Sequence, residues 1–173
     1  ASHSWDRTVR IWNATTGHGE RLLSNAGVGG AMAYSPDGKR LFAGRLDVTE
    51  NAAHRRFGSA ARIRAISFSP DGSRYVAGTS GHTAAVFDSD TGEELLTLDH
   101  GSAWYSTVAW RPDGATIATG SFDRAIRLFD ATTGELNQVI RHTESISRIV
   151  WCPDGSRLAL CLDGDETHII HLS

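Results

Sequence analysis

The chain has 173 residues, with 17 Lys and Arg against 20 Asp and Glu and a formal net charge of −3. Because there is no long basic run and no apolar stretch long enough to span a bilayer as a helix, we expect neither a nucleic-acid partner nor a membrane partner. Two cysteines are too few for a disulfide framework and favour a reducing compartment, so we expect a cytoplasmic protein.

One segment occurs three times along the chain. It is SWDRTVRIWNATTG at residues 4–17, a more divergent copy TSGHTAAVFDSDTG at 79–92, and GSFDRAIRLFDATTG at 120–134. In the last copy, residues 125–130 alternate with period two and are rich in β-branched and aromatic side chains, which predicts a strand. Gly134 can supply the positive φ of the turn that follows. A segment written three times indicates a repeat protein.

A second marker, Pro-Asp-Gly, occurs four times and fixes the period. Its prolines stand at positions 36, 70, 112 and 153, so the spacings are 34, 42 and 41 residues. Pro presets φ for a turn and Asp-Gly closes it, so each marker predicts a hairpin between two strands. A period of about 40–45 residues with four strands is typical of a propeller blade.

Together, the PDG markers and the DRTVRIWN…TG segments resemble the WD40 family of β-propellers over essentially the whole chain. The resemblance implies an all-β fold, a β-propeller built of four-stranded antiparallel blades, with about four repeats present. We expect one propeller segment over residues 1–173. It divides into a partial blade at 1–25, blades at about 26–59, 60–99 and 100–141, and a partial blade at 142–173.

The second blade departs from the pattern. Between residues 49 and 59 it is about eight residues shorter than the family period allows, and it has neither a WD-like strand nor a TG turn. We therefore expect a missing or irregular outer hairpin there.

Both ends of the sequence lie within a blade, which indicates a partial ring or a ring closed by oligomerisation. Residues 8–24 could complete the blade that begins at residue 146. That arrangement would close a small ring from one chain, or a larger ring in a homo-oligomer of two chains.

In the WD40 family, a His before the first strand, a Ser or Thr on the second, an Asp in the following turn and a Trp on the third strand hydrogen-bond together. Such a network must satisfy every member to be worth burying. The resemblance therefore implies a structural role rather than a catalytic triad for the matching residues. These are Ser2, Asp6 and Trp12 in the first blade; His100, Thr119 and Asp123 in the fourth, with Phe129 in place of Trp; and His142 in the fifth, with His171 at the Trp position.

Other candidates for chemistry are weak. Cys152 and Cys161 fall on neighbouring strands of one blade, and we expect buried free thiols rather than a zinc pair because four suitable ligands are absent. His168 and His171 lie three apart on a strand and face opposite sides, which is poor for one metal ion. We expect no metal, no cofactor and no catalytic residue.

Partners in this family usually dock on the face that carries the turns between second and third strands and the loops before first strands. Aromatic and Arg side chains dominate interface hot spots because they bury large areas and offer donors. At Trp5 and Phe122, which share the tip of an Asp turn, we expect exposure and contact. The matching positions are Trp5, Arg7, Arg64, His82, Trp104, Tyr105, Phe122, Arg124 and Arg148.

The resemblance implies a non-catalytic scaffold for protein–protein interaction, as a module of a larger protein or assembly. A second hypothesis is a ligand-binding or enzymatic site in the central channel, which would need convergent carboxylates, histidines or metal ligands. The innermost predicted strands offer only arginines, which can bind an anion but are poor general acids or bases. A third hypothesis, a self-assembling propeller fragment, rests on the incomplete blades at the two ends.

Overall fold

The structure, a computed structural model, describes residues 1–4, 6, 8–24, 30–43, 46–47, 55–56, 63–79, 83–99, 105–164 and 166–172. Every regular element in these residues is a β-strand, so the predicted all-β fold is confirmed. None of the described residues forms a helix with the length and hydrophobicity that crossing a bilayer requires.

The described strands form five antiparallel sheets in chain order. The first sheet holds β1 (Ser2–His3), β2 (Thr8–Trp12) and β3 (Gly19–Ser24), and the second holds β4 (Met32–Tyr34), β5 (Leu41–Ala43), β6 (Leu46–Asp47) and β7 (Arg55–Arg56). The third sheet holds β8 (Ile63–Phe68), β9 (Arg74–Thr79), β10 (Thr83–Asp88) and β11 (Glu94–Asp99). The fourth holds β12 (Tyr105–Trp110), β13 (Thr116–Ser121), β14 (Ala125–Asp130) and β15 (Leu136–Arg141), and the fifth holds β16 (Ile146–Trp151), β17 (Arg157–Leu162) and β18 (Thr167–His171).

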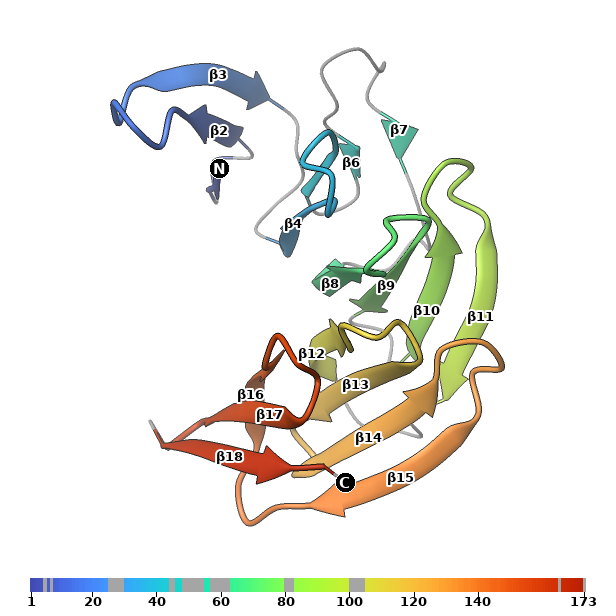
Figure 1. Cartoon of the computed structure of the whole chain (residues 1–173). Helices are drawn as coiled ribbons and strands as arrows, with labels where there is room; N and C mark the ends of the chain where they lie inside the picture. Colours follow the sequence, from blue (N-terminus) through green and yellow to red (C-terminus); the bar gives the residue numbers. More distant parts are fainter. Residues whose placement is uncertain are drawn as a thin grey trace.

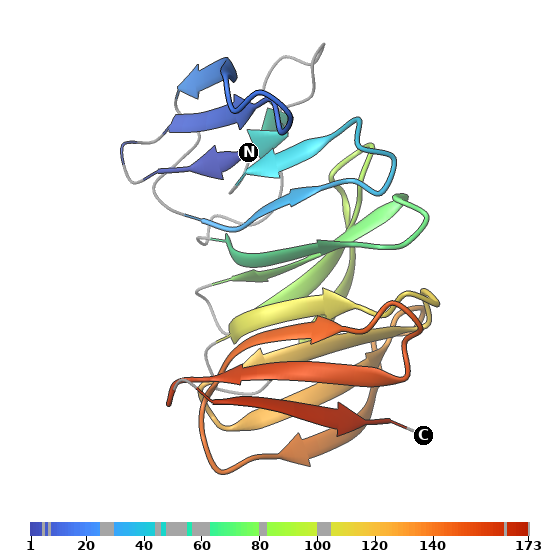
Figure 2. The ribbon, with the colours of Figure 1, turned by 60° about the vertical axis from the view of Figure 1, so that its left-hand side comes forward.

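The sheets follow one another along an open arc, as blades of a propeller do (Figure 1). The strands β8, β12 and β16, each the first of its sheet, lie on the inside of the arc, where β12 packs between the other two. The strands β11 and β15 lie on the outside. Figure 2 shows the first sheet at the top of the arc and the fourth and fifth sheets together at the bottom. The ring is not closed, so the expectation that residues 8–24 complete the blade begun at residue 146 within one chain is wrong.

The second sheet has four strands, so its outer hairpin is not missing. Most of the segment 49–59, where an irregular hairpin is predicted, lies outside the described residues, which include two residues each of β6 and β7. The two strands pair with each other, with Leu46 opposite Arg56 and Asp47 opposite Arg55.

The two turn markers of the sequence share one backbone feature. All four PDG turns and the three TG turns place their glycine at positive φ, between 70° and 79°. Glycine reaches this region without the steric cost that a Cβ imposes. The predicted hairpins between first and second strands are therefore confirmed, and each TG turn begins with an Asp or Asn side chain that caps it, such as Asp130.

The hydrophobic core is divided among the spaces between successive sheets. We call the face of a sheet that is turned toward the next sheet in the chain its front face, and the opposite face its back face. Between the third and fourth sheets, for example, front-face Val76 and Val86 cluster with back-face Ile117 and Phe129. Equivalent clusters lie between the other neighbouring sheets. The sheets therefore stabilise one another as repeat units do, because each unit buries its faces only against its neighbours.

Candidate interaction surface

The turn between β13 and β14 presents two of the predicted contact residues. Arg124 donates its backbone N–H to the Ser121 carbonyl at 3.3 Å, and Phe122 at the tip is 44 % exposed. Arg124 is also exposed, and its φ of 66° makes it the one residue other than glycine with positive φ in the described part of the chain. The turn therefore holds an aromatic side chain and an arginine side chain two residues apart, both exposed to solvent.

The segment between β15 and β16 holds this turn in place. His142 donates its backbone N–H to the Arg124 carbonyl at 2.8 Å, and the Ser145 hydroxyl donates to the Phe122 carbonyl at 3.2 Å. The Ser145 carbonyl in turn accepts from the Asp163 N–H of the fifth sheet at 3.2 Å. The tip residues are thus tied by their backbone to two sheets, while their side chains stay available.

His142, predicted for the polar network, pairs with a residue that sequence analysis did not connect to it. Its Nε2 lies 3.0 Å from His168 Nδ1, and the two rings meet edge to face with centroids 4.9 Å apart. His168 Nε2 lies 3.2 Å from Glu166 Oε2. Because His142 follows β15 and His168 is in β18, this row of three side chains links the end of the fourth sheet to the outer strand of the fifth.

Asp123 lies beneath the exposed tip and pairs with an arginine of its own strand pair. Its two carboxylate oxygens accept from the Arg127 guanidinium at 3.2 and 2.6 Å, and one also accepts the Ala125 N–H at 3.1 Å. Partial burial raises the pKa of Asp123. The hydrogen bonds and positive charge of Arg127 lower it by more than burial raises it, so the pKa lies below its ordinary value. The carboxylate is therefore ionised at neutral pH and holds the turn.

The first sheet carries the same residue types with a different set of bonds. The Trp12 indole donates to the Ser2 hydroxyl at 2.9 Å, so these two predicted network residues are joined. Asp6 instead accepts the backbone N–H and hydroxyl of Thr8, which lower its pKa, and Arg10 lies over the Trp12 ring at 6.0 Å. The structure therefore separates Asp6 from the Ser2–Trp12 pair.

In the fourth and fifth sheets the Trp position holds other residues. Phe129 and Thr119 are fully buried, and Phe129 has no donor, so the Thr119 hydroxyl finds no hydrogen-bond partner among the described residues. In the fifth sheet, Ile170 is the residue opposite Leu158, as Phe129 is opposite Ile117. The placement of His171 at the Trp position is therefore wrong by one residue.

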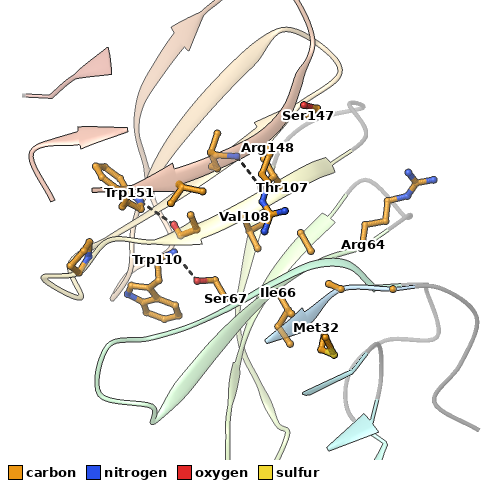
Figure 3. Close-up of a pocket in the computed structure, with 17 residues that line it drawn as sticks. Met32, Arg64, Ile66, Ser67, Thr107, Val108, Trp110, Ser147, Arg148 and Trp151 are labelled. Atoms are coloured by element: carbon orange, nitrogen blue, oxygen red, sulfur yellow. Dashed lines mark hydrogen bonds between the residues drawn. The ribbon is translucent and has the colours of Figure 1, made fainter. Parts of the chain in front are cut away.

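Two predicted arginines lie on the inner wall of the arc. Figure 3 shows Arg64 of β8 and Arg148 of β16 among the residues that line a hollow of about 580 Å³. Side-chain hydroxyls join the neighbouring strands β8, β12 and β16. The Ser67 hydroxyl accepts the Trp110 N–H at 3.1 Å, and the Thr107 hydroxyl accepts the Ile149 N–H at 3.3 Å. Among the described residues of this lining, Arg64 and Arg148 are the charged ones, and none is His, Cys, Asp or Glu.

Several predicted positions lie outside the described residues. These are Trp5, Arg7, His82, His100 and Trp104, and for Tyr105 the structure describes the backbone in β12 but not the side chain.

The cysteines differ from the expectation of buried thiols. Cys152 is partly buried and replaces the serine of the SPDG turns, where its sulfur accepts the Arg157 N–H at 3.0 Å. A hydrogen bond from this thiol is the main reason that the pKa of Asp154 is well below its ordinary value. Cys161 is exposed, because it points from the front face of the fifth sheet, against which no described residue packs.

Sequence analysis also missed arginines that tie one sheet to the next. Arg74 donates to the Ala131 carbonyl at 2.8 Å and lies over the Trp110 ring at 5.0 Å, which joins the third sheet to the fourth. Arg40 makes the same bond one sheet earlier, to the Ser89 carbonyl. The signal was present, since both arginines stand four residues after the proline of a PDG turn.

Stacked four-stranded antiparallel sheets around an arc define a protein of the β-propeller class. Within this class, residues 52–88 and 92–130 match the family model of the WD domain, G-beta repeat. These two stretches are WD40 repeats, and the resemblance predicted from the sequence is confirmed over them. WD40 repeats indicate a module for protein interaction. The second match runs from β11 through β14, so each sequence repeat supplies the outer strand of one sheet and three strands of the next.

Proposed function

We propose that the chain is a non-catalytic scaffold that binds a protein partner through the exposed turn at residues 121–124. The single observation that carries this proposal is the rigid presentation of Phe122 and Arg124. Their backbone is tied to two sheets, so little conformational freedom is lost when the side chains are buried by a partner. Aromatic and Arg side chains are the types that contribute most to protein interfaces.

The described residues support a scaffold better than a channel enzyme. The inner hollow offers Arg64 and Arg148 but no carboxylate, imidazole or thiol, and arginine is a poor general acid or base. The free cysteines suit a reducing compartment, and we place the protein in the cytoplasm on that ground.

The test compares proteins captured by the immobilised wild-type chain with those captured by Phe122→Ala and Arg124→Ala. Tyr34→Ala is the matched control, because Tyr34 is an aromatic residue of similar exposure, 47 %. It lies in the second sheet beside a PDG turn, and PDG turns are at the other end of the strands from the turn at 121–124. We expect a partner whose retention falls at least about tenfold with the turn variants and is unchanged with the control. Capture that is equal for all four chains would overturn the proposal.

A further inference from the structure

The two end sheets of the arc each expose a face that the inner sheets bury. In β9 and β13 all residues from the second to the sixth are buried, on both faces. In the equivalent strand β17, buried residues alternate with residues that are exposed or partly buried. The fifth sheet therefore covers its back face and leaves its front face open.

Two exposed residues of that open front face are apolar at positions where the fourth sheet packs on its neighbour, whereas Thr167 stands at the position of Ile126. Val150 and Ile169 are 53 % and 59 % exposed. The strand registers place them at the positions of Ala109 and Leu128, which pack against the fifth sheet. The sequence thus keeps packing residues at positions where no described residue packs on them.

The back face of the first sheet is the complementary surface. Trp12 stands at the position of Phe129, and it is 41 % exposed whereas Phe129 is 1 % exposed. Phe129 reaches its burial by packing against Val76 and Val86 on the front face of the third sheet. In the fifth sheet those two front-face positions are held by Ala159 and Ile169.

The two surfaces also carry the donor and the acceptor of the hydrogen bond that joins neighbouring sheets elsewhere in the arc. Arg40 and Arg74 each donate to a carbonyl that follows the third strand of the next sheet. Arg157 holds the same position in the fifth sheet, is exposed, and its guanidinium donates no hydrogen bond within the described part of the chain. Ala14 holds the position of the accepting residue in the first sheet, one residue after the Asn that opens the TG turn, and is exposed.

We propose that copies of this chain associate head to tail, with the front face of one copy's fifth sheet on the back face of the next copy's first sheet. Ile169 packs on Trp12 as Val86 packs on Phe129, and Arg157 donates to the Ala14 carbonyl. The two surfaces differ, so the contact is heterologous and produces a closed ring or an open chain of copies. It uses faces separate from the turn at 121–124, and it does not depend on the proposed scaffold function.

The test uses light scattering after gel filtration on the full chain and on two variants, Ile169→Asp and Trp12→Asp. Each substitution adds a charge to one of the two open faces and leaves the core between sheets intact, and circular dichroism with thermal melting checks that both variants fold. We expect wild-type mass to rise with concentration above the 18.7 kDa of one chain, and both variants to stay at that mass.

Mixing the two variants gives the sharper result. Ile169→Asp keeps an intact first sheet and Trp12→Asp keeps an intact fifth sheet, so an equimolar mixture should form one species of twice the chain mass and stop there. Phe122→Ala, the matched surface control, should associate like the wild type. A wild-type chain that stays monomeric from micromolar to millimolar concentration would overturn the proposal. So would a Trp12→Asp variant that dimerises alone, because that result indicates a symmetric contact between two fifth sheets.

Discussion

The fourth and fifth sheets follow the same strand pattern, and they differ in what lies beside them. The fourth sheet has a neighbour on each side, and Ile126 and Leu128 on its front face are buried. The fifth sheet has a neighbour on one side, and Thr167 and Ile169 at the same positions are exposed. A single β-strand pattern therefore gives full burial or half burial according to whether a second sheet covers it.

One pair of equivalent residues shows the same difference at atomic scale. Gly120 of β13 has so little space that an added Cβ would lie 2.7 Å from an Ile146 methyl and 2.8 Å from a Thr107 methyl. At the same register position in β17 stands Cys161, whose side chain is exposed. The close approach of the fifth sheet requires glycine in the fourth, and the open front face of the fifth sheet accepts a side chain.

The largest effect that tests this comparison is the loss of a packed side chain. Leu128→Ala should lower the free energy of unfolding by about 2–5 kcal/mol, because it removes buried methyl groups and leaves a cavity between two sheets. Ile169→Ala, at the equivalent position, should cost less than about 1 kcal/mol in dilute protein, since little apolar area is lost from the folded state. Urea unfolding followed by circular dichroism measures both, and equal losses would mean that the two faces are covered alike.

The second test adds volume instead of removing it. Gly120→Val should destabilise the chain by about 1–3 kcal/mol, because Ile146 and Thr107 must move to admit the side chain. Cys161→Val places the same side chain at the equivalent position and should change stability by no more than about 0.5 kcal/mol. Melting temperatures of the two variants give the comparison directly, and a neutral Gly120→Val would show that the fourth and fifth sheets are not in close contact.

A pH titration tests the turn of the fourth sheet. Because the folded-state pKa of Asp123 lies below its ordinary value of 3.8, its pairing with Arg127 contributes fully above that value. The contribution is lost as the pH falls through the lowered folded-state pKa. Asp123→Asn should therefore reduce stability by about 1 kcal/mol at neutral pH and make the loss of stability in acid less steep. A parallel shift at all pH values would show that the carboxylate charge does not matter.

The smallest effect concerns the backbone of the same turn. Arg124→Gly should raise stability by about 0.5 kcal/mol, because glycine relieves the cost of positive φ and loses part of that gain through greater freedom when unfolded. Gly164→Ala in the corresponding turn of the fifth sheet should be neutral within about 0.5 kcal/mol, since the group near the new methyl is the mobile end of Glu144. Destabilisation by Arg124→Gly would mean that the arginine side chain itself holds the turn.

Strands and turns were predictable because their signals are local. Alternation over residues 125–130 and the Pro-Asp-Gly markers indicate strands and hairpins without any knowledge of neighbours, and β14 occupies Ala125–Asp130 as predicted.

Features that depend on which sheets are adjacent were not predictable. The pair of His142 and His168 joins two sheets across 26 residues of sequence, and each residue alone gives no sign of the other. Exposure of Cys161 likewise depends on the open face of the fifth sheet rather than on the β17 sequence. The one-residue error at His171 is of another kind and was avoidable, because Ile170 follows Pro153 by 17 residues as Phe129 follows Pro112.

The central claim, that the front face of the fifth sheet is an open packing face that another copy covers, is tested most directly at Cys161. In a Cys152→Ser chain Cys161 is the single thiol, and the serine restores the residue found in two of the other PDG turns. We predict that the rate of maleimide labelling falls as protein concentration rises, and that Ile169→Asp in the same background removes this dependence. A labelling rate that does not change with concentration, or that falls equally in both chains, would contradict the claim.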